Sequence, residues 1–193
     1  IETIECDCIC VSGFWTPTIH LASQSGNKTK FNEEIDAFVP GQSKQNETTV
    51  GSANGIFSLE KTLKTSFETG YEISKKITKK ENKVSVPQAS EKKFTQHDKF
   101  WCVPLPKEKN YKRFLDFQND VVVTDVELAI REGYRSIEHV KRYTTLGMAT
   151  DQGKTSNLNG LQLVSNIENK IVPSVGHTTF RPPFTPVSIG AIV

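Results

Sequence analysis

The sequence predicts an α/β fold in which a strand-and-helix half is followed by a small, mostly helical domain. Residues 4–12 are almost all apolar or small, which is typical of a strand buried on both faces of a parallel sheet. Residues 59–77 carry apolar side chains at the helical period of 3.6. The second half of the chain shows several short helical patterns, each preceded by a capping residue.

The composition is ordinary and disfavours several functional classes. Of the 193 residues, 36% are hydrophobic and 24% are charged, and the net charge of +2 is too small to indicate nucleic-acid binding. No apolar run approaches the ~18 residues of a membrane span, and no signal-peptide pattern is present, so we expect a cytoplasmic protein without membrane contact. The strand-like start at Ile1 and the apolar end at Val193 lead us to expect a piece of a longer polypeptide.

Three of the four cysteines stand two residues apart, at Cys6, Cys8 and Cys10. Side chains at this spacing share one face of a strand. Zinc sites instead use C-x2-C turns together with a second Cys or His pair, which this sequence lacks. We predict that these cysteines pack in the core, and a reactive thiol or a metal site are the alternatives.

The rest of the first half combines short strands and helices. We expect one or two helical turns within 18–25, and short strands near 37–39 and 48–50. Ser58 is a suitable N-cap for the long helix that follows. Several lysines lie at the C-terminal end of this helix, where positive charges interact favourably with the helix macrodipole. We therefore interpret them as a solvated helix end, and a site for an anionic partner is the alternative.

A turn of small residues, Gly51-Ser-Ala-Asn-Gly55, precedes the long helix. Backbone N–H groups at such a turn can approach the pyrophosphate of a dinucleotide. A tight turn without a ligand explains the same residues equally well, and the G-x-G-x-x-G fingerprint is absent.

Three short helices are expected in the second half. Thr124-Asp-Val-Glu127 fits a capping box, and the helix that it starts should end near Gly133. Ser136 can cap a second helix, and Thr155 or Ser156 can cap a third.

Polar residues lie beside the second and third of these helices. Thr144, Thr145, Lys154 and Thr155 offer hydroxyl groups and a cation, which suits a phosphate. A capped helix after a polar loop explains them equally well. The four histidines have no catalytic arrangement around them, and we interpret them as surface or supporting residues.

Longer stretches of the sequence resemble one family. The segments 117–120, 131–157 and 178–188 strongly resemble the alpha subunit of heterotetrameric sarcosine oxidase. In the first half, 11–17, 38–41 and 51–55 are similar to the end of the dinucleotide-binding domain of that family.

The resemblance implies a division of the chain into four segments. These are the C-terminal part of a disulfide-reductase-like dinucleotide-binding domain of NAD/FAD type (1–82), a linker (83–111), a small helical module (112–172) similar to the [2Fe–2S] domain of bacterioferritin-associated ferredoxin, and an extended segment (173–193) leading to a missing folate-binding domain. The four cluster-ligand positions of the module fall on Asp116, Gln118, Asp151 and Ser156. None is cysteine, so we expect no iron–sulfur cluster and no metal.

The resemblance also implies a function. Such enzymes oxidatively demethylate sarcosine to glycine with formation of hydrogen peroxide and methylenetetrahydrofolate. They use NAD, FMN/FAD and tetrahydrofolate in a complex of alpha, beta, gamma and delta subunits. This segment would supply part of the NAD site and of the flavin and subunit interface, no catalytic residue, and no activity in isolation. The alternative is a non-catalytic assembly scaffold whose cofactor turn is vestigial.

The site residues follow from the same resemblance. The residues expected at NAD are Ser52, Ala53, Asn54, Gly55, Ser58 and Leu59. Those expected to face the flavin or the beta subunit are Thr144, Thr145, Lys154 and Thr155. The phosphate-binding glycine fingerprint would lie upstream, so we expect this segment alone to bind NAD weakly or not at all.

Overall fold

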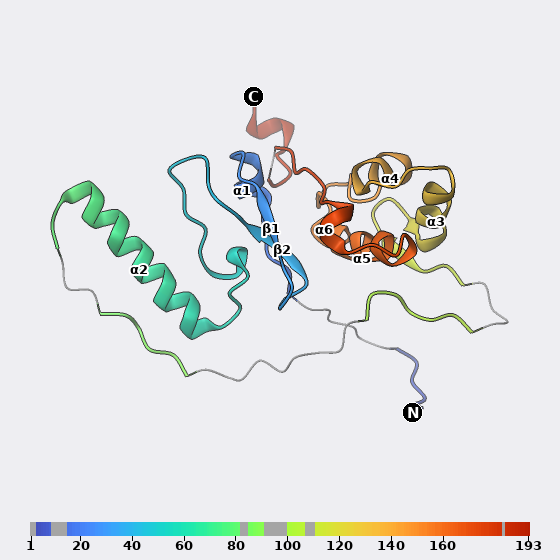
Figure 1. The fold of residues 1–193 in the computed structure, drawn as a ribbon, viewed down its shortest axis with the longest axis horizontal. Coiled ribbons are helices and arrows are strands. Elements are labelled where there is room, and N and C mark those ends of the chain that lie inside the picture. Colours follow the sequence, from blue (N-terminus) through green and yellow to red (C-terminus); the bar gives the residue numbers. More distant parts are fainter. Residues whose placement is uncertain (1–2, 9–14, 82–84, 91–99, 107–110, 183) are drawn as a thin grey trace.

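A computed structural model describes residues 3–8, 15–81, 85–90, 100–106, 111–182 and 184–193. A small hairpin with a short helix lies near the centre of the molecule (Figure 1). The long helix α2 extends to one side of it, and four helices, α3 to α6, cluster on the other. The predicted mixture of helices and strands is therefore confirmed.

The central part is built from α1 (His20–Gln24), β1 (Thr29–Asn32) and β2 (Ala37–Pro40). The two strands pair antiparallel with Lys30 opposite Val39. The helical turns expected within 18–25 and the strand near 37–39 are confirmed. The strand expected near 48–50 is wrong, because this segment has no regular structure and leads directly into the 3₁₀ turn η1 (Gly51–Asn54).

Helix α2 (Leu59–Thr78) forms as predicted, and its N-cap is the expected one. The Ser58 hydroxyl accepts a hydrogen bond from the Lys61 N–H at 3.2 Å. None of its residues is buried, and Phe67 and Ile73 on its apolar side are 38% and 44% exposed. The helical period therefore predicted the element correctly, whereas its apolar face is not covered by the described residues.

The prediction of a buried cysteine strand is wrong for the residues that the structure describes. Residues 3–8 form no strand, and Cys6 and Cys8 are exposed. Cys10 lies outside the described residues. A strand buried on both faces requires neighbouring strands, and the described part of the chain contains only two antiparallel pairs, neither of which includes this segment.

We expect Cys6 and Cys8 to react with a maleimide in the native protein as fast as a free thiol does. Cys102 should react at least about ten times more slowly, because partial burial restricts access of the reagent to its Sγ. Timed quenching with peptide mass spectrometry measures the three rates, and the denatured chain supplies the reference rate. Protection of Cys6 and Cys8 in the native state would restore the buried strand.

The helical module surrounds one hydrophobic core. Its elements are β3 (Phe114–Asp116), β4 (Val121–Val122), α3 (Val123–Arg131), α4 (Ile137–Thr144), α5 (Asn157–Ile167) and α6 (Val172–Val175). Val126, Val140, Leu146 and Val164 are completely buried. Helix α3 packs against both α4 and α5, so residues from three separate segments close the core.

Local capping interactions set the ends of these helices. Ser136 caps α4 as predicted, since its hydroxyl accepts from the His139 N–H at 3.4 Å. The N-cap of α3 is Val122, two residues before the expected Thr124, and Asp125 Oδ2 accepts from the Val122 N–H at 2.9 Å. The helix ends beside Gly133, as expected, with φ of +98°.

The N-cap of α5 is Ser156, one of the two expected residues, but the Ser156 hydroxyl makes no capping bond. Asp151 instead organises the turn that precedes the helix. Its Oδ2 accepts from both the backbone N–H and the hydroxyl of Thr155, at 3.3 and 2.7 Å.

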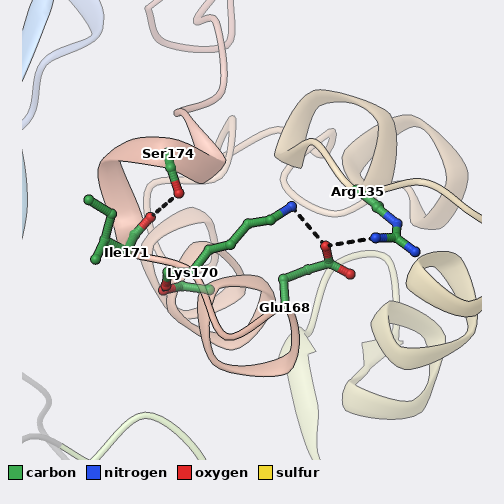
Figure 2. A network of polar contacts seen from close by, with 6 residues as sticks. Arg135, Glu168, Lys170, Ile171 and Ser174 are labelled. Carbon is green, nitrogen blue, oxygen red and sulfur yellow. Dashed lines mark hydrogen bonds and ion pairs between the residues drawn. The ribbon is translucent and has the colours of Figure 1, made fainter.

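A network of charges closes the other end of α5 (Figure 2). Glu168 Oε2 lies 2.9 Å from Lys170 Nζ and 3.8 Å from Arg135 Nη1, and its side chain is 8% exposed. The hydrogen bond from Lys170 lowers the pKa of Glu168. This network joins the C-terminal end of α5 to the segment that leads into α4.

The tail after α6 has the short 3₁₀ turn η2 (Ile189–Ala191), and its other described residues form no regular structure. The prediction of an extended segment from 173 onward is corrected at its start, because Pro173 lies in the first turn of α6, where proline is tolerated. None of the helices in the described residues is long and apolar enough to cross a membrane.

Candidate functional site

Two pockets of the described residues flank Phe180 in the tail. The larger has a volume of about 290 Å³ and lies between α4, the loop after it and residues 179–181. The smaller has about 60 Å³ and lies between α1, α5 and residues 177–180. The tail therefore forms a wall of both pockets, although it is remote in sequence from α1 and α4.

His20 occupies the smaller pocket. Its side chain is buried, and its ring lies 3.7 Å from that of Phe180. Nε2 lies 3.4 Å from the carbonyl oxygen of Gln152, and Nδ1 is buried without a hydrogen-bond partner in the described residues. Burial lowers the pKa of His20; the Gln152 carbonyl opposes this shift, and the charge of Lys154 adds to it. The expectation of a surface or supporting role gave no sign of this burial.

The free energy of unfolding should fall as the pH drops below about 6.5, the ordinary pKa of His20. Below that pH the imidazole is protonated in the unfolded chain, whereas burial disfavours its protonation in the folded chain. The contribution of neutral His20 to the free energy of unfolding is therefore fully present only above that pH. The slope from this group is at most about 1.4 kcal/mol per pH unit. His20→Phe should flatten it in urea titrations between pH 7.5 and 5, while the same change at exposed His139 serves as the control. Equal pH profiles for wild type and His20→Phe would contradict the assignment.

The loop between α4 and α5 is packed around one side chain. Gly147 and Gly153 have φ of +67° and +71°, and a Cβ on either would lie 2.0 to 2.2 Å from the Asn157 side chain. Both polar atoms of the Asn157 amide are buried and lack partners in the described residues. The two glycines are thus required by conformation and by space, and Asn157 lies at the wall of the smaller pocket.

Three of the four positions that correspond to cluster ligands make side-chain hydrogen bonds. Asp116 is 3% exposed; its Oδ1 accepts from the Gln118 and Asn119 N–H groups at 2.9 and 3.3 Å, and its Oδ2 accepts from the Gly147 N–H at 2.8 Å. Gln118 Oε1 accepts from the Thr150 hydroxyl at 2.7 Å.

Asp116 and Gln118 thus join two loops through hydrogen bonds, Asp151 accepts hydrogen bonds within its own loop, and the Ser156 hydroxyl is buried without a partner in the described residues. None of the four side chains is a thiolate, so they do not fit an iron–sulfur cluster. No group of three or more His, Cys, Asp or Glu side chains in the described residues could hold a metal ion.

The helical module and the tail together are similar to one domain of known proteins. Residues 110–193 match the family model of the sarcosine oxidase A3 domain. This segment belongs to that family. The chain is 38% identical to a "Sarcosine oxidase subunit alpha" of Rhizobium meliloti (strain 1021) over 192 residues, and 35% identical to one of Corynebacterium sp. (strain U-96) over 198 residues. Both alignments cover 99% of this chain, which spans about a fifth of the length of these relatives.

A solved structure shares the fold. A crystal structure of L-proline dehydrogenase from P. horikoshii matches 92% of this chain and 37% of its own, with a TM-score of 0.66 and 20% sequence identity. The likeness extends well beyond the A3 domain, so the segments before residue 110 belong to the shared fold as well.

The residues predicted to face a flavin lie in the A3 domain and use their polar groups internally. Thr144 Oγ1 donates to the Val140 carbonyl at 2.8 Å, and Thr155 Oγ1 donates to Asp151. Lys154 Nζ donates to the Phe184 carbonyl at 2.7 Å and lies 4.5 Å from the centre of its ring. Thr145 has φ of +64° beyond the end of α4. Their role toward a flavin stays a prediction.

The residues predicted at NAD lie elsewhere, where η1 leads into α2. Ser52 and Leu59 are exposed, and Ala53 and Asn54 are half-buried. Gly55 has φ of +78°, and a Cβ there would lie 2.8 Å from Ile35 and 3.0 Å from Val39. The half-buried turn and the N-terminus of α2 offer backbone N–H groups and hydroxyls, which fit a phosphate. The structure does not bring this set and the flavin set into one site.

Proposed function

We propose that this chain is part of the alpha subunit of a flavin-dependent sarcosine oxidase, in which it supplies part of the NAD site and of the interface with the flavin and the other subunits. The observation that carries the proposal is the similarity to sarcosine oxidase alpha subunits along 99% of the chain. The complete enzyme would demethylate sarcosine to glycine, form hydrogen peroxide and pass the one-carbon unit to tetrahydrofolate.

The cofactors would supply the redox chemistry, and this chain would position them. In the proposal, residues 1–82 complete a disulfide-reductase-like dinucleotide-binding domain, and NAD lies against the turn from Ser52 to Gly55 and the start of α2 at Ser58 and Leu59. The A3 domain, with Thr144, Thr145, Lys154 and Thr155, faces the flavin and the beta subunit. No residue of this chain is proposed to be catalytic.

The test of the NAD site uses the full-length gene product together with its partner subunits. Gly55→Ala should lower NAD affinity at least about ten-fold, because the added methyl group meets Ile35 and Val39 and displaces the turn. Gly133→Ala is the matched control, since Gly133 also has positive φ but an added Cβ meets nothing within 4 Å. NAD content and calorimetric titration measure the effect.

The alternative is a non-catalytic assembly scaffold with a vestigial cofactor turn. The internal hydrogen bonds of Thr144, Lys154 and Thr155 favour it, since these side chains already have partners within the chain. If Gly55→Ala leaves NAD binding unchanged but reduces co-purification of the other subunits, the scaffold is correct. If both are unchanged, neither role of this turn holds.

A further inference from the structure

The larger pocket beside Phe180 brings together three cationic side chains and one carboxylate. Lys141 and Arg142 come from the last turn of α4, Arg181 comes from the tail, and Glu138 lies one turn earlier on α4. Because Arg181 is about forty residues from α4 in sequence, only the path of the tail places it here.

The tail that carries Arg181 is fixed on both sides of it. The Thr179 N–H donates a hydrogen bond to Glu138 Oε1, and the Phe180 ring lies tilted against the ring of buried His20. On the other side, the Phe184 carbonyl accepts from Lys154 Nζ at 2.7 Å. These contacts fix the tail on both sides of Arg181, against α4, α1 and the loop before α5.

The positive charges of this pocket are only partly compensated. Glu138 Oε2 lies 3.7 Å from Arg142 Nη2. Within the described residues, Lys141 and Arg181 form no ion pair. Lys141 is also half-buried, and burial lowers its pKa; Glu138 opposes this shift, while Arg181 and Arg142 add to it. Three cations against one carboxylate leave two positive charges that a dianion would balance.

We propose that this pocket binds the phosphate group of a phosphate monoester. Guanidinium groups pair with phosphate oxygens through two parallel hydrogen bonds, and a lysine adds a point charge. The volume of about 290 Å³ exceeds what a phosphate group needs, and Met148 and Phe180 give the pocket an apolar wall for the organic part of the ligand.

The proposal rests on the pocket and not on the proposed oxidase function. Flavin mononucleotide and the adenylate part of a dinucleotide both carry such a phosphate, so the probes must separate these sources. We would titrate the full-length gene product with inorganic phosphate, flavin mononucleotide, adenosine 5′-monophosphate and riboflavin in calorimetry at one fixed, low ionic strength, because salt screens exposed charges.

At least one phosphate-bearing probe should bind, and riboflavin should bind at least about ten-fold more weakly than flavin mononucleotide. Lys141→Gln and Arg181→Gln should each lower the affinity for the probe that binds by about ten-fold or more. Lys61→Gln and Arg131→Gln, on exposed faces of α2 and α3, are the matched controls and should change nothing. Arg181 is exposed, so its variant keeps the test valid if Lys141→Gln is unstable.

Preference for flavin mononucleotide, for adenosine monophosphate or for phosphate alone would each support the site and identify its source. The proposal is overturned if no phosphate-bearing probe binds, or if the Lys141 and Arg181 variants bind it as tightly as the controls do. Failure here with intact NAD binding at the α2 turn would leave the proposed function standing. Phosphate binding at this pocket together with loss of the predicted NAD binding at the α2 turn would reject the NAD site and support this pocket.

Discussion

Gly153→Ala should lower the free energy of unfolding by about 3 kcal/mol, which combines the left-handed backbone with overpacking. Gly153 has φ of +71°, and the added methyl group would lie 2.2 Å from both polar atoms of the Asn157 amide. That amide cannot move aside easily, because it is buried against Gly147 as well. Urea denaturation followed by circular dichroism measures the change.

Two variants separate the clash from the backbone effect. Gly133→Ala shares the positive φ but meets nothing within 4 Å, so it should cost only about 1 kcal/mol. Combining Gly153→Ala with Asn157→Ala should cost less than the two single effects added together, because the second change removes the atoms that collide. Equal costs for Gly153→Ala and Gly133→Ala would disprove the packing around Asn157.

Asp116→Ala should destabilise the helical module by about 3 to 4 kcal/mol. The change removes one carboxylate that accepts three backbone N–H bonds, and the Gly147 N–H would remain buried without a partner. Asp116→Asn keeps one acceptor and turns an amide donor toward another donor, so we expect about 2 kcal/mol. Thermal and urea unfolding of the full-length gene product measure both.

The control for Asp116 is Glu132→Gln, an exposed carboxylate at the end of α3 whose loss should change stability by less than about 0.5 kcal/mol. Hydrogen exchange adds a local measurement, because the Gly147 amide should lose protection in Asp116→Ala before the core of α3 does. Equal stability of Asp116→Ala and Glu132→Gln would show that this carboxylate does not join the two loops.

Elements governed by neighbouring residues could be predicted from the sequence. The long helix α2, its Ser58 cap, the Ser136 cap and the end of α3 at Gly133 all depend on hydrogen bonds within one turn. The capping box expected at Thr124 was wrong by two residues, because Asp125 accepts from the Val122 N–H and β4 runs directly into α3. The short strands of β3 and β4 gave no periodic signal and were not predicted.

The candidate site could be predicted only in part. The sequence singled out the loop near Lys154 and Thr155 and the turn before α2, but not His20, Lys141 or Arg181. These three have no local pattern that marks them, since each gains its role from the tail. Phe180 covers His20, which is more than a hundred residues away in sequence. Arg181 lies in one pocket with Lys141, which is about forty residues away.

The sequence by itself therefore determined helices α1 to α5, the Ser58 and Ser136 caps, the family resemblance and the lack of cysteine at the four cluster-ligand positions. Tertiary structure alone decided that Cys6 and Cys8 are exposed, that His20 is buried, and that Asp116 joins two loops thirty-one residues apart. The physical reason is the range of the interactions. Caps and helical periods are satisfied within a few residues, whereas burial and charge clusters depend on which distant segments cover them.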